Sequence, residues 1–369
     1  MSCGRCSFFR CRIPLNLGLS CPADRESDNI ARVWGLRNRT AYAADRNWTR
    51  DEHGVHWWVV AIRATFMITT DGKLSLADEQ LPPPLAPEHY GAPGESSLRY
   101  DSELLGRKPS TDVIVLGSAH APGAMPAPTV PVTLRIGSID KTLLVHGDRV
   151  YHDAWGGLSL TDPRPFTRQP IRYELAFGGS DSSDPDPRHH SLDERNPIGR
   201  GFARRNATLA NTLAHAIEYP HGNPTTLGPA GLGPIDRHWL PRRTLAGTYD
   251  TAWAKTKQPL LPDDYDPHFA MCAPADQRPS TALRGGERLG LFNLSPHGAL
   301  VLDLPHIRLE LESHFGRRIQ SHQPPVLTTV LAEPDDSRLA LVWQSVLRVP
   351  ASDADYLDET KIVEKGGGT

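Results

Sequence analysis

The sequence predicts a mainly β protein, a multi-stranded antiparallel β-sandwich type of architecture with long ordered Gly/Pro-rich loops and few short helices. Two observations favour this fold class. The 369 residues include 31 Gly and 34 Pro, more than an average globular chain carries, which favours turns over long helices. About a dozen short runs rich in β-branched and aromatic residues also follow one another, separated by turns or loops.

The strongest strand signal is HWWVVAIRATFMIT, residues 56–69. Asp71-Gly72 follows it and predicts a tight turn, with KLSLA as the returning strand. Apolar residues alternate along the first run and share one face, as in a strand: Trp58, Val60, Ile62, Ala64 and Phe66.

Similar runs predict the remaining strands, at 112–116, 130–136, 141–146, 172–177, 289–294, 299–304, 308–311, 326–332 and 338–349. GSID joins the second and third of these as a hairpin, SPHG joins 289–294 to 299–304, and EPDDS forms a polar turn before the last. Helical signals are sparse. Residues 97–105 allow two turns, and 203–217 is the best candidate for a longer helix, stopped by Tyr219-Pro220.

The composition suggests three regions. Residues 1–31 carry Cys3, Cys6, Cys11 and Cys21 and are expected to be a disordered extension or to precede the true start, with zinc binding as a weaker alternative. Residues 32–350 are expected to form one large β-rich domain, or two packed β subdomains at about 32–180 and 228–350. Residues 351–369 are expected to be a tail.

Charge and cysteine usage limit the partners. The net charge is −3 and no Lys/Arg block appears, so the sequence predicts no nucleic-acid partner. No apolar run reaches the roughly 18 residues of a transmembrane helix, so no membrane partner is expected. Only Cys272 lies in the body of the chain, which favours a reduced, cytoplasmic protein.

Residues 228–278 combine many Gly and Pro residues with large aromatic and charged side chains, and they show little helix or strand periodicity. They predict an ordered, irregular segment. Its rings and Arg–Asp pairs either pack beneath the loops, or bind a protein partner, or line a sugar site. The candidate residues are Trp239, Arg242, Arg243, Tyr249, Asp250, Trp253, Asp276 and Gln277.

Three further clusters carry polar residues. Arg99 and Asp101, with Lys108 and Asp112, precede an apolar strand, either as a rim that contacts a partner or as ion pairs that order a loop. Glu287 follows Gly285-Gly286 in a loop that lacks the spacing and lysine of a phosphate loop. An acidic loop offers a calcium site as a minor alternative to exposed loop residues: Asp181, Asp184 and Asp186.

No motif for catalysis or for cofactor binding is present in the sequence. A nucleophile elbow, a metalloprotease H-E-x-x-H and a dinucleotide fingerprint are all missing. The sequence therefore predicts no enzyme, no catalytic residue, no metal and no cofactor. A carboxylate pair for glycoside hydrolysis stays open, since such a pair comes together only in the fold.

A succession of motifs resembles a bacterial family of uncharacterised domain found in type VI secretion gene clusters: WxVVAxRATF, LADEQ, SSLRYDSELLGRKPSTDVIVLGSA, YELAFGG, RNPIGRGF, PAGLGPIDRHWLPRRxLAGTYDxAW, PLLPDDYD, APADQR and LRGGE. The resemblance covers roughly residues 33–349. The first 30 or so residues have no counterpart in the family. A pentapeptide-repeat extension, which some relatives carry at the C-terminus, is also missing.

The resemblance implies a cytoplasmic adaptor or chaperone without catalytic activity. It would bind a type VI effector and assist its loading onto the spike, so the implied partners are an effector, a PAAR-type tip protein or a spike protein. The alternative is a carbohydrate-active protein, a glycoside hydrolase or a lectin-like module, in which loop aromatics and carboxylates line a sugar site.

Overall fold

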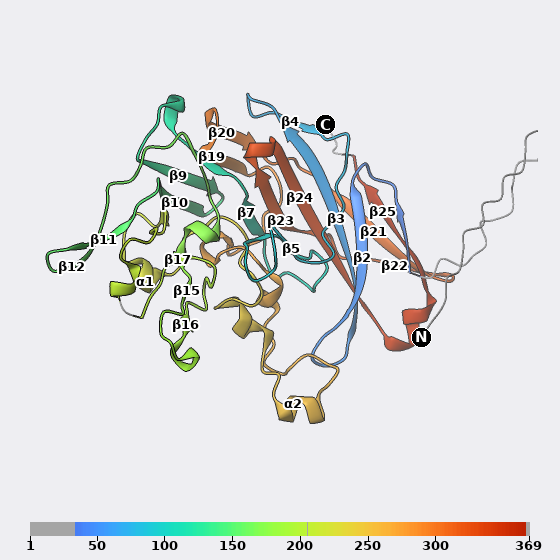
Figure 1. Ribbon diagram of the computed structural model, residues 1–369. Coiled ribbons are helices and arrows are strands. Elements are labelled where there is room, and N and C mark those ends of the chain that lie inside the picture. Colours follow the sequence, from blue (N-terminus) through green and yellow to red (C-terminus); the bar gives the residue numbers. More distant parts are fainter. Residues whose placement is uncertain (1–33, 205, 367–369) are drawn as a thin grey trace, which may run out of the picture. The chain divides into compact units, whose positions relative to one another are not determined.

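The computed structural model describes residues 34–204 and 206–366, and these residues belong to one compact unit (Figure 1). The unit is built of mostly antiparallel sheets with few short helices, which confirms the predicted fold class. The four N-terminal cysteines lie outside the described residues. Within the described part of the chain, no helix is long and apolar enough to cross a membrane.

The largest sheet holds six strands in the order β2, β3, β24, β23, β7, with β4 paired to β3. β3 confirms the strand predicted at 56–69, and β4 confirms its returning partner. The bounds are β2 (Ala43–Arg50), β3 (His56–Ile68), β4 (Leu74–Leu76), β7 (Asp112–Val115), β23 (Val326–Glu333) and β24 (Arg338–Val349).

Both faces of β3 are buried. The predicted face, from Trp58 to Phe66, packs into the main core, and the Trp58 ring donates Nε1–H to Thr360 Oγ1 at 2.9 Å. Val59 and Ala61 on the opposite face pack under Leu104. β3 thus lies at the centre of the domain, which explains its almost unbroken apolar run.

A second sheet has four strands in the order β1, β25, β21, β22. β25 lies inside it, so the predicted tail is wrong for these residues. A register shift near Leu357 breaks the apolar alternation that would have indicated a strand. The bounds are β1 (Gly35–Asn38), β21 (Leu309–Phe315), β22 (Arg318–Ser321) and β25 (Leu357–Glu364).

A third sheet holds five strands in the order β18, β10, β9, β19, β20. The predicted β9–β10 hairpin is present. β9 also pairs with β19, and β7 with β23, so the ranges 32–180 and 228–350 share two sheets and are not separate subdomains. The bounds are β9 (Thr129–Ile136), β10 (Ile139–His146), β18 (Ile217–Glu218), β19 (Arg288–Ser295) and β20 (Gly298–Asp303).

The remaining elements are short. The two-stranded pairs are β5 (Glu88–His89) with β6 (Leu98–Tyr100), β8 (Ser118–His120) with β13 (Arg168–Pro170), β11 (Tyr151–Ala154) with β12 (Gly157–Leu160), β14 (Phe177–Gly178) with β17 (Arg200–Gly201), and β15 (Ser180–Asp181) with β16 (Ser191–Leu192). The helices of the described residues are α1 (Pro224–Leu227) and α2 (Thr251–Thr256), together with several 3-10 turns.

Three local predictions are wrong. Residues 97–105 form β6 and turns, and 172–177 begin with a 3-10 turn at Tyr173–Leu175. In the described part of 203–217, the helical element is a 3-10 turn, Asn206–Leu209, and the segment ends on β18. Its later backbone bonds to other segments: Ala214 donates N–H to the carbonyl of Arg149 and Ala216 to that of Leu175. These long-range bonds replace the local ones a helix would need.

Candidate functional site

The predicted Arg and Asp residues form a buried network. Asp101 is almost fully buried and accepts hydrogen bonds from Arg237 Nη2 and Arg242 Nη2, both at 2.5 Å. Arg242 also donates to the backbone carbonyls of Ile235 at 2.7 Å and of Phe269 at 3.0 Å. The pair therefore holds the irregular segment 235–270 against the β6 region. Arg237 was not among the predicted site residues.

Trp239 lies in the core. Its side chain is 4% exposed, and its ring meets that of Tyr173 edge to face with 5.4 Å between centroids. The Tyr173 hydroxyl donates to the carbonyl of Gly233 at 3.1 Å, which ties the loop to the 3-10 turn. The sequence left three roles open for this ring: packing beneath the loops, binding a protein or lining a sugar site. In the structure, Trp239 packs beneath the loops.

Asp276 and Gln277 meet at a buried lysine. Lys141 Nζ donates to Asp276 Oδ1, Gln277 Oε1 and the carbonyl of Gly231, each at 2.8 Å. Gln277 in turn donates Nε2–H to the carbonyls of Val113 at 2.6 Å and Leu232 at 3.0 Å. Lys141, on β10, is a residue that the sequence did not single out.

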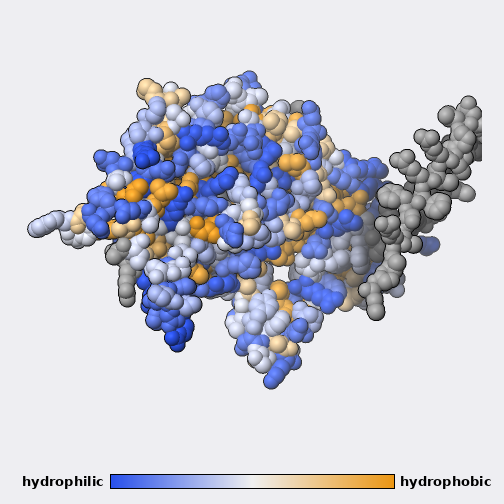
Figure 2. Space-filling view, in the orientation of Figure 1, coloured by the Kyte–Doolittle hydropathy of each residue, from blue (hydrophilic) through white to orange (hydrophobic). Residues whose placement is uncertain are grey.

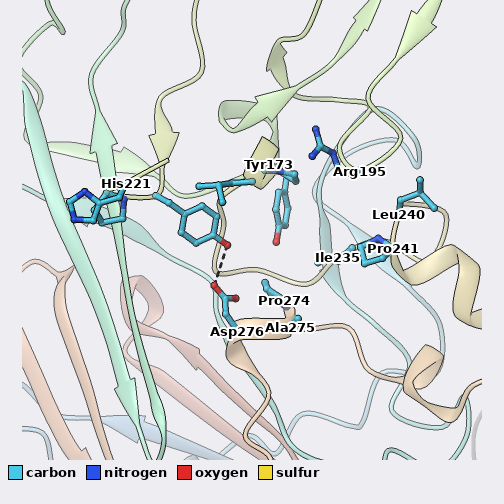
Figure 3. Close-up of a pocket in the computed structure, with 13 residues that line it drawn as sticks. Tyr173, Arg195, His221, Ile235, Leu240, Pro241, Pro274, Ala275 and Asp276 are labelled. Atoms are coloured by element: carbon cyan, nitrogen blue, oxygen red, sulfur yellow. Dashed lines mark hydrogen bonds between the residues drawn. The ribbon is translucent and has the colours of Figure 1, made fainter. Parts of the chain in front are cut away.

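Asp276 also lies at the wall of a pocket of about 530 Å³ (Figure 3). His221 stands on one side and Leu240 with Pro241 on the opposite side, with Tyr173 between them. The Tyr219 hydroxyl donates to Asp276 Oδ2 at 3.1 Å. The remaining wall is largely apolar and includes Pro274.

Lys141, Tyr219 and Arg195, at or near this pocket, are engaged in the contacts that hold the loops. Burial lowers the pKa of Lys141, against the opposing effect of Asp276, and burial raises the pKa of Tyr219, with Asp276 adding to that rise. The Arg195 guanidinium is held by both carboxylate oxygens of Asp193, at 2.9 and 2.7 Å. The arrangement fixes the fold of the loop segment and does not present an activated nucleophile or base.

Tyr249, Asp250 and Trp253 come together in a projecting segment, residues 248–264, which we call the α2 lobe. Asp250 caps α2 by accepting from the Trp253 backbone N–H at 2.8 Å. The Trp253 ring donates Nε1–H to the carbonyl of Leu260 at 2.9 Å and meets Tyr249 edge to face. Figures 1 and 2 show the lobe as a knob that stands off the body. Tyr249 is 52% exposed.

The other predicted residues stand apart. Glu287 accepts from the backbone N–H groups of Arg284 and Gly285, at 2.8 and 2.9 Å, and so closes a local turn. Arg243 pairs with Glu194 at the surface. Arg99 stacks on Tyr100, with 4.9 Å from Cζ to the ring centre.

The sequence left Lys108 and Asp112 as either part of a partner-binding rim or part of ion pairs, and in the structure they form a buried ion pair together with Glu103. Lys108 Nζ lies 2.9 Å from Glu103 Oε2 and 3.1 Å from Asp112 Oδ2, in a fully buried site. In the acidic loop, Asp181 accepts from Ser183 and from the Arg204 backbone N–H, while Asp186 pairs with Arg188. In the described residues, no group of three or more His, Cys, Asp or Glu side chains could hold a metal ion.

Among the described residues, the most exposed aromatic side chain is one that the sequence analysis did not single out, Trp155. Trp155 forms the turn between β11 and β12, and its side chain is fully exposed at 108% of the reference area. Gly156 follows with φ +99°, a backbone conformation that favours glycine and closes the two-residue turn. Figure 1 shows this hairpin projecting from the body at the far left. The Trp-Gly-Gly triplet between two short alternating runs was the available signal.

Comparison with known proteins gives one result. No curated protein and no solved structure matches this chain. A family model matches residues 53–344, which include most of the six-stranded sheet, the pocket and the α2 lobe. The chain therefore belongs to a family described as an uncharacterized protein conserved in bacteria, DUF2169.

Proposed function

We propose that this protein is a cytoplasmic adaptor that binds a type VI secretion effector and assists its loading onto the spike and tip complex. The observation that carries the proposal is the fully exposed Trp155 at the tip of the β11–β12 hairpin. The motif order of the chain, which resembles proteins of type VI secretion clusters, supplies the class of partner.

An exposed tryptophan on a tight turn suits protein recognition. Burying such a ring removes about 150–250 Å² from water and contributes about 4–6 kcal/mol before the costs of association. Tryptophan and tyrosine are enriched among the residues that dominate interface energies. The α2 lobe offers a second exposed ring, Tyr249, held by Trp253. Both rings lie on projecting elements, where a large partner can reach them.

The pocket of Figure 3 supports the carbohydrate alternative poorly. Hydrolysis of a glycosidic bond ordinarily needs two carboxyl groups about 5–9.5 Å apart. Asp276 is the single carboxylate in the wall of this pocket, and it already accepts hydrogen bonds from Lys141 and Tyr219. This pocket therefore favours binding without catalysis over hydrolysis of a sugar.

Trp155→Ala is expected to weaken capture of the effector at least tenfold, because the variant removes the most exposed aromatic anchor. The test is a pull-down and titration with the effector encoded beside this gene. The melting temperature of the Trp155→Ala variant should stay within about 1 °C of wild type, since exposed side chains contribute little to stability. Tyr356→Ala is the matched control, because Tyr356 is 67% exposed but lies in the turn before β25.

If the Trp155→Ala variant captures the effector as well as wild type does, the β11–β12 hairpin is not part of the interface. If wild-type protein also fails to retain the effector, and the effector is secreted normally from cells that lack the protein, the adaptor proposal is wrong.

A further inference from the structure

Three arginines and two tyrosines alternate in space near β5 and β6, and we call them the arginine–tyrosine stack. Arg63 Cζ lies 5.7 Å from the centre of the Tyr100 ring, and Arg99 Cζ lies 4.9 Å from the same centre. Arg99 Cζ lies 5.8 Å from the Tyr90 ring, and Arg172 Cζ lies 3.8 Å from it. The order is therefore Arg63, Tyr100, Arg99, Tyr90, Arg172.

The stack leads from the core to the surface. Arg63 is 3% exposed, the Arg99 side chain is 38% exposed, and Arg172 is exposed. Stacking on a tyrosine face holds a guanidinium in place while its N–H groups stay available at the edge. Arg99 and Arg172 are thus fixed in position at the surface by one ring, that of Tyr90.

The nearby carboxylates are engaged elsewhere. Glu333 accepts from the Tyr100 hydroxyl at 2.5 Å and from Arg338 Nε at 2.6 Å, whereas Arg99 reaches it only at 3.8 Å. Arg99 Nη2 also lies 4.0 Å from Asp336 Oδ2, which Arg338 Nη2 approaches more closely, at 3.3 Å. Glu174 accepts from the backbone N–H of Ser97 and pairs with its hydroxyl.

In the described residues, no carboxylate forms an ion pair with Arg172, so its exposed guanidinium keeps donors for a ligand. Nε and Nη2 of Arg63 also lack a hydrogen-bond partner, but they are buried. Arg172 is therefore the exposed guanidinium of the stack that is open to a ligand, and the carboxylates of Glu333 and Glu174 also lie near Tyr90.

A guanidinium fork binds a carboxylate through two parallel hydrogen bonds. Arg99 Cζ and Arg172 Cζ lie 5.8 and 3.8 Å from one ring centre, so they are less than about 10 Å apart. In an extended peptide, side chains two residues apart project from the same side at roughly 6.5–7 Å. That spacing is within the upper limit on the distance between the two guanidiniums, so two acidic residues of one extended peptide can reach both.

We propose that Arg99 and Arg172, stacked on Tyr90, bind an extended acidic segment of the partner protein, with acidic residues at alternate positions. This inference rests on the proposed adaptor function and names the chemistry of one part of its partner. It is separate from the aromatic contact at Trp155. Nucleic acid, whose bases also stack on tyrosine and arginine, is the competing ligand class.

The test uses fluorescence anisotropy with a labelled eight-residue (Glu-Ser)4 peptide and the full-length protein. Wild type is expected to bind it with an affinity that falls as salt rises. The double variant Arg99→Gln/Arg172→Gln should weaken binding at least tenfold. Arg172→Lys should lose part of the affinity, because it keeps the charge but not the fork. Tyr90→Leu should weaken binding while both arginines remain.

Arg135→Gln is the matched control and should bind as wild type. Arg135 also stacks on a ring, that of Phe292 at 5.4 Å, but its guanidinium is already paired with Asp140 at 3.1 Å. A (Gln-Ser)4 peptide should not bind. Equal melting temperatures for all of these variants would show that the fold is kept.

Two results would overturn the inference: no binding of (Glu-Ser)4 by wild type, or equal binding by the double variant. Tighter binding of a labelled eight-nucleotide oligothymidylate than of (Glu-Ser)4 would also overturn it. The peptide assay contains no effector, so a negative result there would contradict only the acidic-segment inference. The adaptor proposal is tested separately, by the pull-down with the effector.

Discussion

Trp239→Ala is expected to lower the free energy of unfolding by about 3–5 kcal/mol, because the ring is 4% exposed and packs against Tyr173. The melting temperature should fall by roughly 5–15 °C. Trp239→Phe keeps most of the buried area and should cost less. Differential scanning calorimetry and urea unfolding measure both effects.

The experiment separates a packing role from a binding role for residues 228–278. Trp155→Ala serves as the control, since that ring is exposed and its loss should leave unfolding unchanged. A Trp239→Ala protein that melts like wild type and yet fails to capture the effector would contradict the core position of this ring.

The regular strands were predictable because the local sequence patterns of strands and turns agree with the way these segments pair in the folded protein. The alternation in β3 and the GSID hairpin each carry their own strand and turn chemistry. β25 was not predictable in this way. Its apolar residues Leu357 and Ile362 straddle a register shift, and its partners β1 and β21 are distant in sequence.

The candidate site was only half predictable. Composition identified Asp101, Arg242 and Gln277 as residues with a role, yet their partners could not be deduced. Arg242 meets Asp101 across 141 positions, and Lys141 meets Gln277 across 136. Solvent exposure was harder still to predict from the sequence. Trp155 and Trp239 are the same residue type near Gly and Pro residues, yet the fold exposes the first and buries the second.

Asp101→Asn is expected to lower the free energy of unfolding by about 3–5 kcal/mol, because it leaves the buried Arg242 guanidinium without its counter-charge. Asp303→Asn is the control. Asp303 pairs with Arg288 at 2.8 Å in a similar way, but both side chains are more than half exposed, so its loss should leave the free energy of unfolding nearly unchanged.

The pH dependence follows from the same pair. Burial opposes ionisation of Asp101, but Arg242 and Arg237 outweigh it and hold the pKa of this carboxyl below its usual value. A carboxyl with a depressed folded-state pKa stabilises the fold above its unfolded pKa of about 3.9, and that contribution is lost as the pH falls through the folded value. The gap in stability between wild type and Asp101→Asn should therefore stay constant from pH 8 to about 4.5 and narrow below about 4.

A double-mutant cycle with Arg242→Gln isolates the pair itself. Once Arg242 is neutral, loss of the Asp101 charge no longer leaves a buried cation unpaired, so the two substitutions together should cost less than the sum of the single costs. We expect a coupling energy of about 1–3 kcal/mol, measured by urea unfolding at pH 7. Additivity within about 0.5 kcal/mol would mean that Arg237 alone neutralises Asp101, and that the backbone carbonyls of Ile235 and Phe269, not the carboxylate, hold Arg242 in place.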